Sequence, residues 1–551
     1  NKTFDFAKSQ MGSAQEIALR LTPLKDVYYT HDTTFDFNPK GHRETNYVLL
    51  GIAFLILFIA GINFTNLTTS LIPLRLKTIN THRVLGCSIY KLQAISLIES
   101  IVICLISYIL ALFIVNDLSY TPIANWVDAD IRLSKYKGLI LLTALIAILT
   151  GCLAGLYPAI RSTSYAPALV LKGSFGLSPK GKKVRVALIG FQYTVSIALI
   201  IVTLFMGLQN HFMTSSEQLG FNKDQVAIVN LTPEIYAKHK PQYIQKLKDY
   251  PGIEDVAFSV YELSKEDDMI DLEYARHEDK DVFFKVFYAS ENFLSFMDIQ
   301  VEEGRDFTRE DLNKAQSDYI INPAAERDFH LHPGDRFNDR TVLGVSKDFR
   351  FNSCRIASSP FVFALNNDIP NPKLVSYIRF NSKTNLQEAV AHVRETLKEI
   401  DPTFPFEISF YNTILNNLYQ KEQTLGKLIS LFGIMAILIS IVGVFGLVLF
   451  ETQYRRKEIG IRKINGATTG QILLMFNKTY IRIVSVCFII SIPIAWMGTQ
   501  QWLENFAYKT PLHLWVFIVA FLIILSVTIG TVTFRNWQAA NENPVNSVKS
   551  E

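Results

Sequence analysis

The stretch LLGIAFLILFIAGI, from Leu49 to Ile62, contains no charged side chain. One run of this length is compatible with a core helix of a soluble protein. The 551-residue chain contains seven apolar runs, however, and 49% of its residues are hydrophobic. About 20 apolar residues in a helix cross the ~30 Å hydrocarbon core of a bilayer. The runs are at 47–72, 95–115, 138–158, 187–208, 428–450, 479–499 and 513–534. The sequence therefore predicts a polytopic α-helical membrane protein.

Charge alternates between the loops that join these runs. The loops at 73–94 and 159–186 carry only basic charges, and the loop at 451–478 is rich in Lys and Arg. The loop at 116–137 balances acids against bases, and the loop at 500–512 is nearly neutral. Because cytoplasmic loops carry the excess of Lys and Arg, the N-terminus is expected outside and the C-terminus in the cytoplasm. The same rule places the long segment 209–427 outside.

Segment 209–427 has the pattern of an extracytoplasmic α+β domain. Stretches rich in β-branched and aromatic residues predict strands, and apolar residues at three- and four-residue spacing predict helices between them. The expected strands are 225–231, 282–289, 341–349, 374–380 and 406–412. The expected helices are 238–250 and 385–400, with a last helix at 414–427 that continues into the next span without a proline break.

An internal repeat appears at an offset of 380 residues, the distance from Arg75 to Arg455. The first basic loop reads RLKTINTHRVLGCS over 75–88, and the third reads RRKEIGIRKINGAT over 455–468. The chain ends repeat more loosely, with APALVLK at 166–172 and NPVNSVK at 543–549. Each half therefore has three spans, a basic loop after the first span and a proline-containing tail after the third.

The repeat divides the chain into five parts. We expect the chain to be a fragment, because by symmetry a further span and most of a first external domain should precede residue 1. The parts are 1–45, the tail of that first external domain; 46–172, a first three-span unit; 173–208, a cytoplasmic linker with a connecting span; 209–427, the external domain; and 428–551, a second three-span unit.

The second basic loop and the external segment carry motifs of a known family. RRKEIGIRK at 455–463, followed by Asn-Gly-Ala at 465–467, resembles the R-x-K-E-I-G-I-R-K-x-x-G-A stretch of FtsX-like, MacB-like permeases of ABC transporters. The first copy departs from it at Thr78 and Asn80. EEGRDFT (302–308), INPAAER (321–327) and GVSKDFRF (344–351) resemble a MacB-like periplasmic core domain. The resemblance is to the doubled, eight-span form of the family.

This resemblance implies a non-catalytic permease subunit of the bacterial inner membrane. Its partner would be a dimer of separate ABC ATPase subunits that binds the ATP, so no cofactor is expected on this chain. Movement of the ATPases would pass through the spans to the periplasmic domain and drive export or efflux. The alternative is an FtsX-like scaffold that regulates an extracytoplasmic enzyme such as a cell-wall hydrolase. A periplasmic adaptor and membrane lipid are further expected partners, and nucleic acid is not; the cargo is not readable from the sequence.

The two basic loops are the candidate ATPase-coupling elements. After Gly460 the chain is expected to form a short helix along the membrane surface that turns back near Gly466. The alternative is that the basic residues only determine the orientation of the chain in the membrane. Glu458 is expected to pair with Arg462 at i,i+4 or with the partner. The candidate coupling residues are Arg75, Lys77, Arg83, Gly86, Arg455, Arg456, Lys457, Glu458, Gly460, Arg462, Lys463 and Gly466.

Enzymatic signatures are missing from the sequence. The nearest approach to a phosphate-binding loop, GLSPKGKK at 176–183, has Lys183 where a magnesium-binding Ser or Thr is required, and we interpret it as a basic linker. His330 and His332, with Asp328 and Asp335, do not have the H-E-x-x-H spacing of a zinc site, so no metal is predicted. The five cysteines are interpreted as small apolar residues.

Polar residues within the spans are expected at helix contacts, because a bilayer penalises exposed polar groups. These residues are Asn63, Asn66, Glu99 and Gln192, for which snorkelling to the interface is an equal alternative and a substrate pathway the less favoured interpretation. Gly443 and Gly446 are expected to allow two helices to approach closely.

Overall fold

A computed structural model describes residues 22–29, 43–121, 124, 132–164, 179–215, 219–264, 271–278, 280–314, 316–350, 352–365 and 374–541. The repeated tails at 166–172 and 543–549 lie outside these residues. The chain separates into two compact units, 1–58 and 59–551. In the first unit, α1 (Leu24–Val27) is followed by the start of α2, and Arg43 pairs with Asp26.

Seven of the described helices are long and apolar enough to cross a membrane, which confirms the polytopic prediction. Each of them overlaps one predicted span. The largest differences are at the starts of α7, α14 and α16, which begin eight, eight and ten residues before the predicted spans. The helices are α2 (Arg43–Ser70), α4 (Ile89–Leu118), α5 (Lys137–Thr163), α7 (Pro179–Thr214), α14 (Gln420–Tyr454), α16 (Thr469–Leu503) and α17 (Leu514–Asn541). Helix α7 begins at Pro179, so Lys180 to Lys183 are helical rather than linker.

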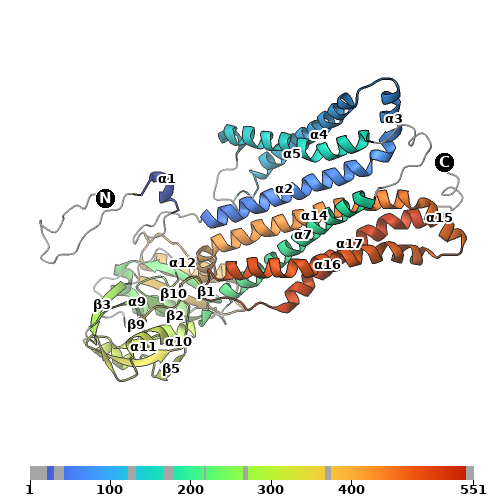
Figure 1. Ribbon diagram of the computed structural model, residues 1–551. Helices are drawn as coiled ribbons and strands as arrows, with labels where there is room; N and C mark the ends of the chain where they lie inside the picture. Colours follow the sequence, from blue (N-terminus) through green and yellow to red (C-terminus); the bar gives the residue numbers. More distant parts are fainter. Residues whose placement is uncertain are drawn as a thin grey trace. The chain divides into compact units, whose positions relative to one another are not determined.

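Helices α7, α14, α16 and α17 pack together, and Figure 1 shows them running side by side. Their shared core contains Ile197, Phe205, Val448 and Ile524, all fully or almost fully buried. Hydrogen bonds between helices add to this packing. The Ser196 hydroxyl lies 3.0 Å from that of Ser440, and the Thr528 hydroxyl lies 3.0 Å from that of Tyr193.

Helices α2 and α14, one from each permease unit, are in contact at the side-chain amide of Asn63. Asn63 donates a hydrogen bond from Nδ2 to the carbonyl oxygen of Ile439. A Cβ atom at Gly443 would overlap Asn63 Oδ1, and one at Gly446 would lie 2.9 Å from Leu67 Cδ1. The expected close approach at both glycines is therefore confirmed. Thr65 bonds in the other direction, to the Ala154 carbonyl of α5 at 2.8 Å.

The external segment forms a mixed sheet of eleven strands among the described residues. Its main path runs β11-β1-β10-β2-β4-β9-β6-β8-β5, with β3 on β4 and β7 on β8. The pairs β4–β9 and β6–β8 are parallel and the others are antiparallel. The strands are β1 (Val226–Leu231), β2 (Ile253–Ser259), β3 (Asp271–His277), β4 (Lys280–Ala289), β5 (Val301–Gly304), β6 (Tyr319–Ile321), β7 (Arg336–Phe337), β8 (Arg340–Ser346), β9 (Phe361–Leu365), β10 (Leu374–Phe380) and β11 (Ser409–Phe410).

The sheet buries both of its faces. Side chains alternate between two cores, since Val362 and Ala364 face one and Phe361, Phe363 and Leu365 face the other. The first core is covered by α9 (Pro233–Lys248), α11 (Pro323–Phe329) and α12 (Leu386–Ile400), and the second by α10 (Phe293–Met297) and α13 (Tyr411–Leu418). The α+β prediction is confirmed.

Two expectations at the end of this domain are wrong. Only Ser409 and Phe410 of the predicted strand 406–412 pair with the sheet, because Tyr411 starts α13 and is fully buried. Its hydroxyl donates to the Leu263 carbonyl at 2.8 Å. The final helix is not continuous either: α13 ends at Leu418 and α14 starts at Gln420, with Tyr419 between them at φ −105° and ψ 14°.

Candidate functional site

The first candidate coupling element is α3 (Ile72–Val84), which follows α2 after a single residue, Leu71. Pro73 lies at the start of α3, and a proline cannot donate the backbone bond that would continue α2. Arg75 and Arg83 lie on α3, as does the backbone of Lys77, whose side chain is outside the described part. The element is therefore a short helix at the turn between two long apolar helices.

The second element is α15 (Arg456–Ile464), which follows α14 after Arg455. The expected short helix is present, but it begins before Gly460 rather than after it, so Gly460 is buried within the helix. No proline interrupts this copy, and α14 accordingly extends four residues further than α2 does under the repeat offset. The side chains of Arg456 and Lys457 lie outside the described part.

Both elements end in the same turn. Gly86 has φ +90° and Gly466 has φ +87°, a backbone conformation that L side chains rarely adopt. The amide of Cys87 donates to the His82 carbonyl at 3.0 Å, and the amide of Ala467 donates to the Arg462 carbonyl at 2.9 Å. These bonds form a Schellman motif, in which the chain reverses direction behind a left-handed residue.

The helices that follow also start alike. The Ser88 hydroxyl accepts from the Lys91 amide and the Thr468 hydroxyl accepts from the Gln471 amide, each at 3.3 Å. These pairs are separated by the 380-residue offset of the repeat. The repeat is therefore one of backbone geometry as well as of sequence.

The basic residues of the first element are bonded to neighbouring helices. Arg75 makes two parallel bonds of 2.8 Å to the carboxylate of Glu99 on α4. Arg83 donates to the Thr163 carbonyl at the end of α5, at 3.2 Å. Asn80, which stands where the family has glycine, is buried and donates to the Leu76 carbonyl at 2.8 Å. Glu99, expected at a helix contact, therefore ties α4 to α3.

The described charged residues of the second element pair with residues close to them in the sequence. Arg462 donates from Nε and Nη2 to Glu458 Oε1 at 3.1 and 2.9 Å, which confirms the expected i,i+4 pair. Arg455 lies 3.1 Å from Glu451 and 3.9 Å from Glu458, and its guanidinium lies 5.8 Å from the ring of Phe476. Lys463 occupies the last turn of α15.

The geometry gives each element two properties relevant to coupling. Each is short and is joined to a span at both ends by only a few residues, so a displacement of the helix would act on two spans. Each also presents basic side chains to solvent: Arg75 is 48% exposed and Arg462 is 53% exposed. Both arginines are already paired, Arg75 with Glu99 and Arg462 with Glu458, so an acidic protein surface or anionic lipid would compete with these carboxylates. The coupling role of the twelve candidate residues stays a prediction.

A second contact region, which the sequence did not indicate, joins the external domain to the helix ends. We call it the junction cluster: Met213 at the end of α7, Cys354 after β8, Tyr419 between α13 and α14, and Phe506 after α16. All four side chains are buried. They come from segments far apart in the chain, so periodicity alone could not bring them together; the aromatic residues of QWLENFAY (501–508) were the available signal.

Hydrogen bonds and an ion pair reinforce the junction cluster. The Arg355 Nε lies 2.7 Å from Glu422 Oε1 on α14, and its guanidinium lies 4.6 Å from the ring of Phe506. The Cys354 amide donates to the Tyr419 hydroxyl at 3.3 Å, and the Tyr508 amide donates to the Cys354 carbonyl at 3.1 Å. Burial raises the pKa of the Cys354 thiol, which keeps it neutral and unreactive.

The amide of Gln209 completes this region from α7. Its Nε2 donates to the Tyr508 carbonyl at 3.0 Å, and its Oε1 accepts from the Thr510 amide at 2.8 Å. Gln209 is fully buried. The loop between α16 and α17 is thereby fastened to the external end of α7.

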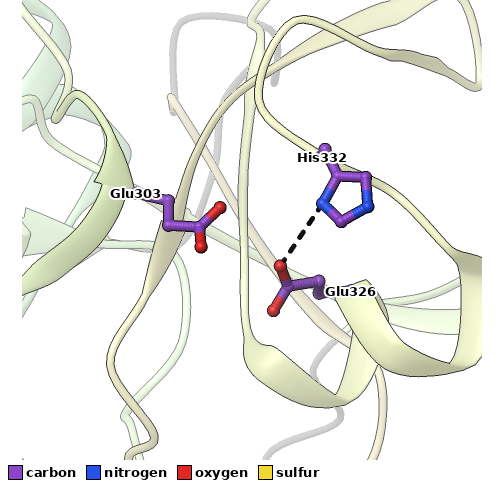
Figure 2. Close-up of side chains that lie close together, drawn as sticks. All are labelled: Glu303, Glu326 and His332. Atoms are coloured by element: carbon purple, nitrogen blue, oxygen red, sulfur yellow. Dashed lines mark ion pairs between the residues drawn. The ribbon is translucent and has the colours of Figure 1, made fainter.

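The histidines of the external domain are arranged differently from the set weighed in the sequence. Asp335 accepts from the His332 amide at 2.7 Å, and Asp328 pairs with Arg327 at 3.0 Å. His332 instead lies beside two glutamates, Glu303 and Glu326 (Figure 2).

Comparisons with known proteins agree with the repeat. A family profile described as the FtsX-like permease C-terminal domain matches residues 50–167 and again 430–544. The macrolide export ATP-binding/permease protein MacB of Aggregatibacter actinomycetemcomitans is 24% identical over 212 residues, which span 36% of this chain and 32% of that protein. The chain therefore aligns with about a third of that relative's length.

Two solved extracytoplasmic domains also resemble part of the chain. The periplasmic region of MacB from Actinobacillus actinomycetemcomitans is 15% identical, with 36% of this chain and 94% of that one covered and a TM-score of 0.27. The extracellular domain of the noncanonic ABC-type transporter YknZ from Gram-positive bacteria is 16% identical, with 32% and 95% covered and a TM-score of 0.25.

The family profile occurs twice, once on each half of the internal repeat, and each match includes one of the two helix-turn elements. The MacB relative supports the same assignment. Both halves of the repeat are thus similar to the FtsX-like permease C-terminal family, and part of the chain is similar to the MacB permeases.

Proposed function

We propose that this chain is the permease subunit through which a separate ABC ATPase dimer moves an extracytoplasmic domain to export a substrate. The observation that carries the proposal is the structural equivalence of α3 and α15. A dimer of ATPases presents two similar surfaces. This chain has two similar helix-turn elements, one in each half of its internal repeat. ATP would be bound by the partner, and this chain would supply no cofactor site and no catalysis.

The proposal assigns the two elements to the cytoplasmic side. The basic loops at 73–94, 159–186 and 451–478 favour that side by the positive-inside rule, which puts the external domain on the opposite face of the membrane. The N-terminal end of this chain would then be outside and its C-terminal end cytoplasmic.

Motion would pass from the cytoplasmic elements to the domain along α7 and α14. Both helices are long enough to cross the bilayer, and both end at the junction cluster. The ion pair of Arg355 with Glu422 links the domain directly to α14. A displacement of α15 would therefore reach the loop after β8 without any flexible connection through the membrane.

The proposal is tested by purifying the full-length protein from native membranes and identifying what copurifies. A triple variant Arg455→Glu, Arg456→Glu and Lys457→Glu reverses the charge of the second element. Because Arg455 also pairs with Glu451, a double variant that keeps Arg455 separates partner binding from local misfolding. We expect an ABC ATPase, detected by mass spectrometry and ATP hydrolysis, with the unmodified chain and much less with either variant.

Reversal of Lys135 and Lys137 is the matched control, because these residues are also basic and lie at a helix start on the opposite side. This control should retain the ATPase. Recovery of an external hydrolase, with no ATPase in any sample, would reject the transporter and favour the regulatory scaffold. A periplasmic adaptor found together with the ATPase would support export.

A further inference from the structure

Glu303, Glu326 and His332 bring three potential ligand atoms within 4.8 Å of one another on the external domain. His332 Nδ1 and Glu326 Oε1 are 3.6 Å apart (Figure 2). The three residues come from different elements: β5, α11 and the loop after α11. This convergence is a property of the fold, because Glu303 is 23 residues from Glu326 in the chain.

The backbone beneath each side chain is fixed. Glu303 is paired with Val345 on β8. Helix α11 is capped by Asn322, whose side chain accepts from the Ala325 amide at 2.9 Å. In the following loop Leu331 is 2% exposed, and its amide donates to the Glu326 carbonyl at 3.2 Å. The three side chains therefore need only rotamer changes, and no backbone movement, to close on a common point.

The charges of the cluster are not balanced by neighbouring bases. Among the described residues, neither Glu303 nor Glu326 makes an ion pair with a lysine or arginine. Arg327, the adjacent base on α11, pairs with Asp328 instead. Glu326 is only 27% exposed, and its ligand atom lies within 4.8 Å of those of Glu303 and His332. A cation held between the three side chains would neutralise both carboxylates.

The ligand types select the class of cation. An imidazole nitrogen with two carboxylates suits Zn²⁺ or a similar first-row divalent metal, whereas Ca²⁺ and Mg²⁺ prefer oxygen ligands only. Bonds of about 2.1 Å in a tetrahedral arrangement place ligand atoms about 3.4 Å apart, close to the 3.6 Å already found for one pair. Three protein ligands leave the fourth position to water.

We infer that Glu303, Glu326 and His332 bind one Zn²⁺ ion, which fastens the edge strand β5 to helix α11. Among the described strands, β5 ends the sheet path and pairs with β8 alone. The bound ion would add a second link, from β5 to α11. This inference does not depend on the permease function, because the three residues lie outside the helix-turn elements and the junction cluster.

The experiment uses the full-length protein in detergent, stripped with EDTA and dialysed against micromolar Zn²⁺, with bound metal measured by mass spectrometry. We expect Glu326→Gln and His332→Ala each to lower the affinity by about tenfold or more. His330→Ala is the matched control, because His330 is an exposed histidine two residues away on the same loop and should bind as the unmodified chain does.

X-ray absorption at the zinc edge distinguishes this site from binding by the five cysteines. The inference expects a shell of nitrogen and oxygen at about 2.0 to 2.2 Å, whereas thiolate binding gives sulfur at about 2.3 Å. Equal zinc binding by the unmodified chain and His332→Ala, a sulfur shell, or no binding at all would overturn it.

Discussion

Asp311 organises the segment that follows β5. Arg305 donates two bonds to its carboxylate at 2.7 and 2.8 Å, and the Thr308 amide donates at 2.9 Å. Lys314 lies 2.9 Å away. The side chain is only 2% exposed. These partners, with Arg305 first, hold the pKa of Asp311 well below its usual range.

Asp311→Asn is predicted to destabilise this segment by about 1 to 3 kcal/mol at neutral pH, because a hydrogen-bonded charge is lost while its donors remain. A folded-state pKa below the unfolded value means that the stabilisation is complete above the ordinary aspartate pKa of about 3.9. It is lost as the pH falls from there through the folded pKa. The difference between Asp311→Asn and the unmodified chain should therefore shrink in acid.

Hydrogen exchange of peptides covering 301–314, measured across a pH series and corrected for intrinsic rates, checks this prediction. Asp328→Asn is the control, because Asp328 is exposed and pairs only with its neighbour Arg327 in this part of the chain. A pH-independent difference at Asp311 would show that its charge is not the cause.

At the scale of elements, α14 meets the external domain through the Arg355–Glu422 pair. Glu422 is 9% exposed and Arg355 is 31% exposed, so the pair is partly desolvated. Arg355→Met is predicted to destabilise the junction cluster by about 1 to 3 kcal/mol, because it leaves the carboxylate of Glu422 buried without its partner. Exchange should rise at 352–358 and 415–424 and stay unchanged in β9 and β10.

A double-mutant cycle tests whether the pair itself is responsible. Adding Glu422→Gln to Arg355→Met should restore part of the lost protection, because the second change removes the unpaired charge. Additive effects of the two substitutions would contradict a direct interaction and would attribute the loss to the packing of Arg355 on Phe506.

At the scale of the whole molecule, the two permease units meet where Asn63 of α2 packs against Gly443 of α14. Gly443→Ala is predicted to lower the melting temperature, because its methyl group would overlap Asn63 and separate the helices. Gly530→Ala on α17 is the matched control: nothing lies within 4 Å of a Cβ there, and alanine favours helix by about 1 kcal/mol over glycine. Equal effects of the two substitutions would refute the contact.

Hydropathy, charge and the repeat predicted most of this architecture because they are local or periodic signals. The seven spans and the strands at Val226 and Leu374 follow from them. Strand β2 was not predicted, because Glu254 and Asp255 interrupt its apolar pattern while only its second half is fully buried. The break at Tyr419 was also missed, since no proline or glycine marks it; the Tyr419 hydroxyl instead meets the Cys354 amide.

The candidate coupling elements were readable because each relies on a motif within one short segment. The junction cluster and the Glu303–Glu326–His332 group were not, since each gathers residues from segments that only the folded domain brings together. The boundaries of the five parts stay predictions.

The side-chain amide of Gln209 bonds to the loop as the backbone of a residue does in a parallel β-bridge, because it donates to the Tyr508 carbonyl and accepts from the amide two residues later, at Thr510. Gln209 of α7 thereby fixes the position of the loop that connects α16 to α17. A shift of that loop by one residue would break both bonds. The outer ends of α7, α16 and α17 are consequently linked to one another through this loop. Helix α14 is separated from α13 by the single residue Tyr419. A tilt of α14 at this break need not move the linked ends of the other three helices.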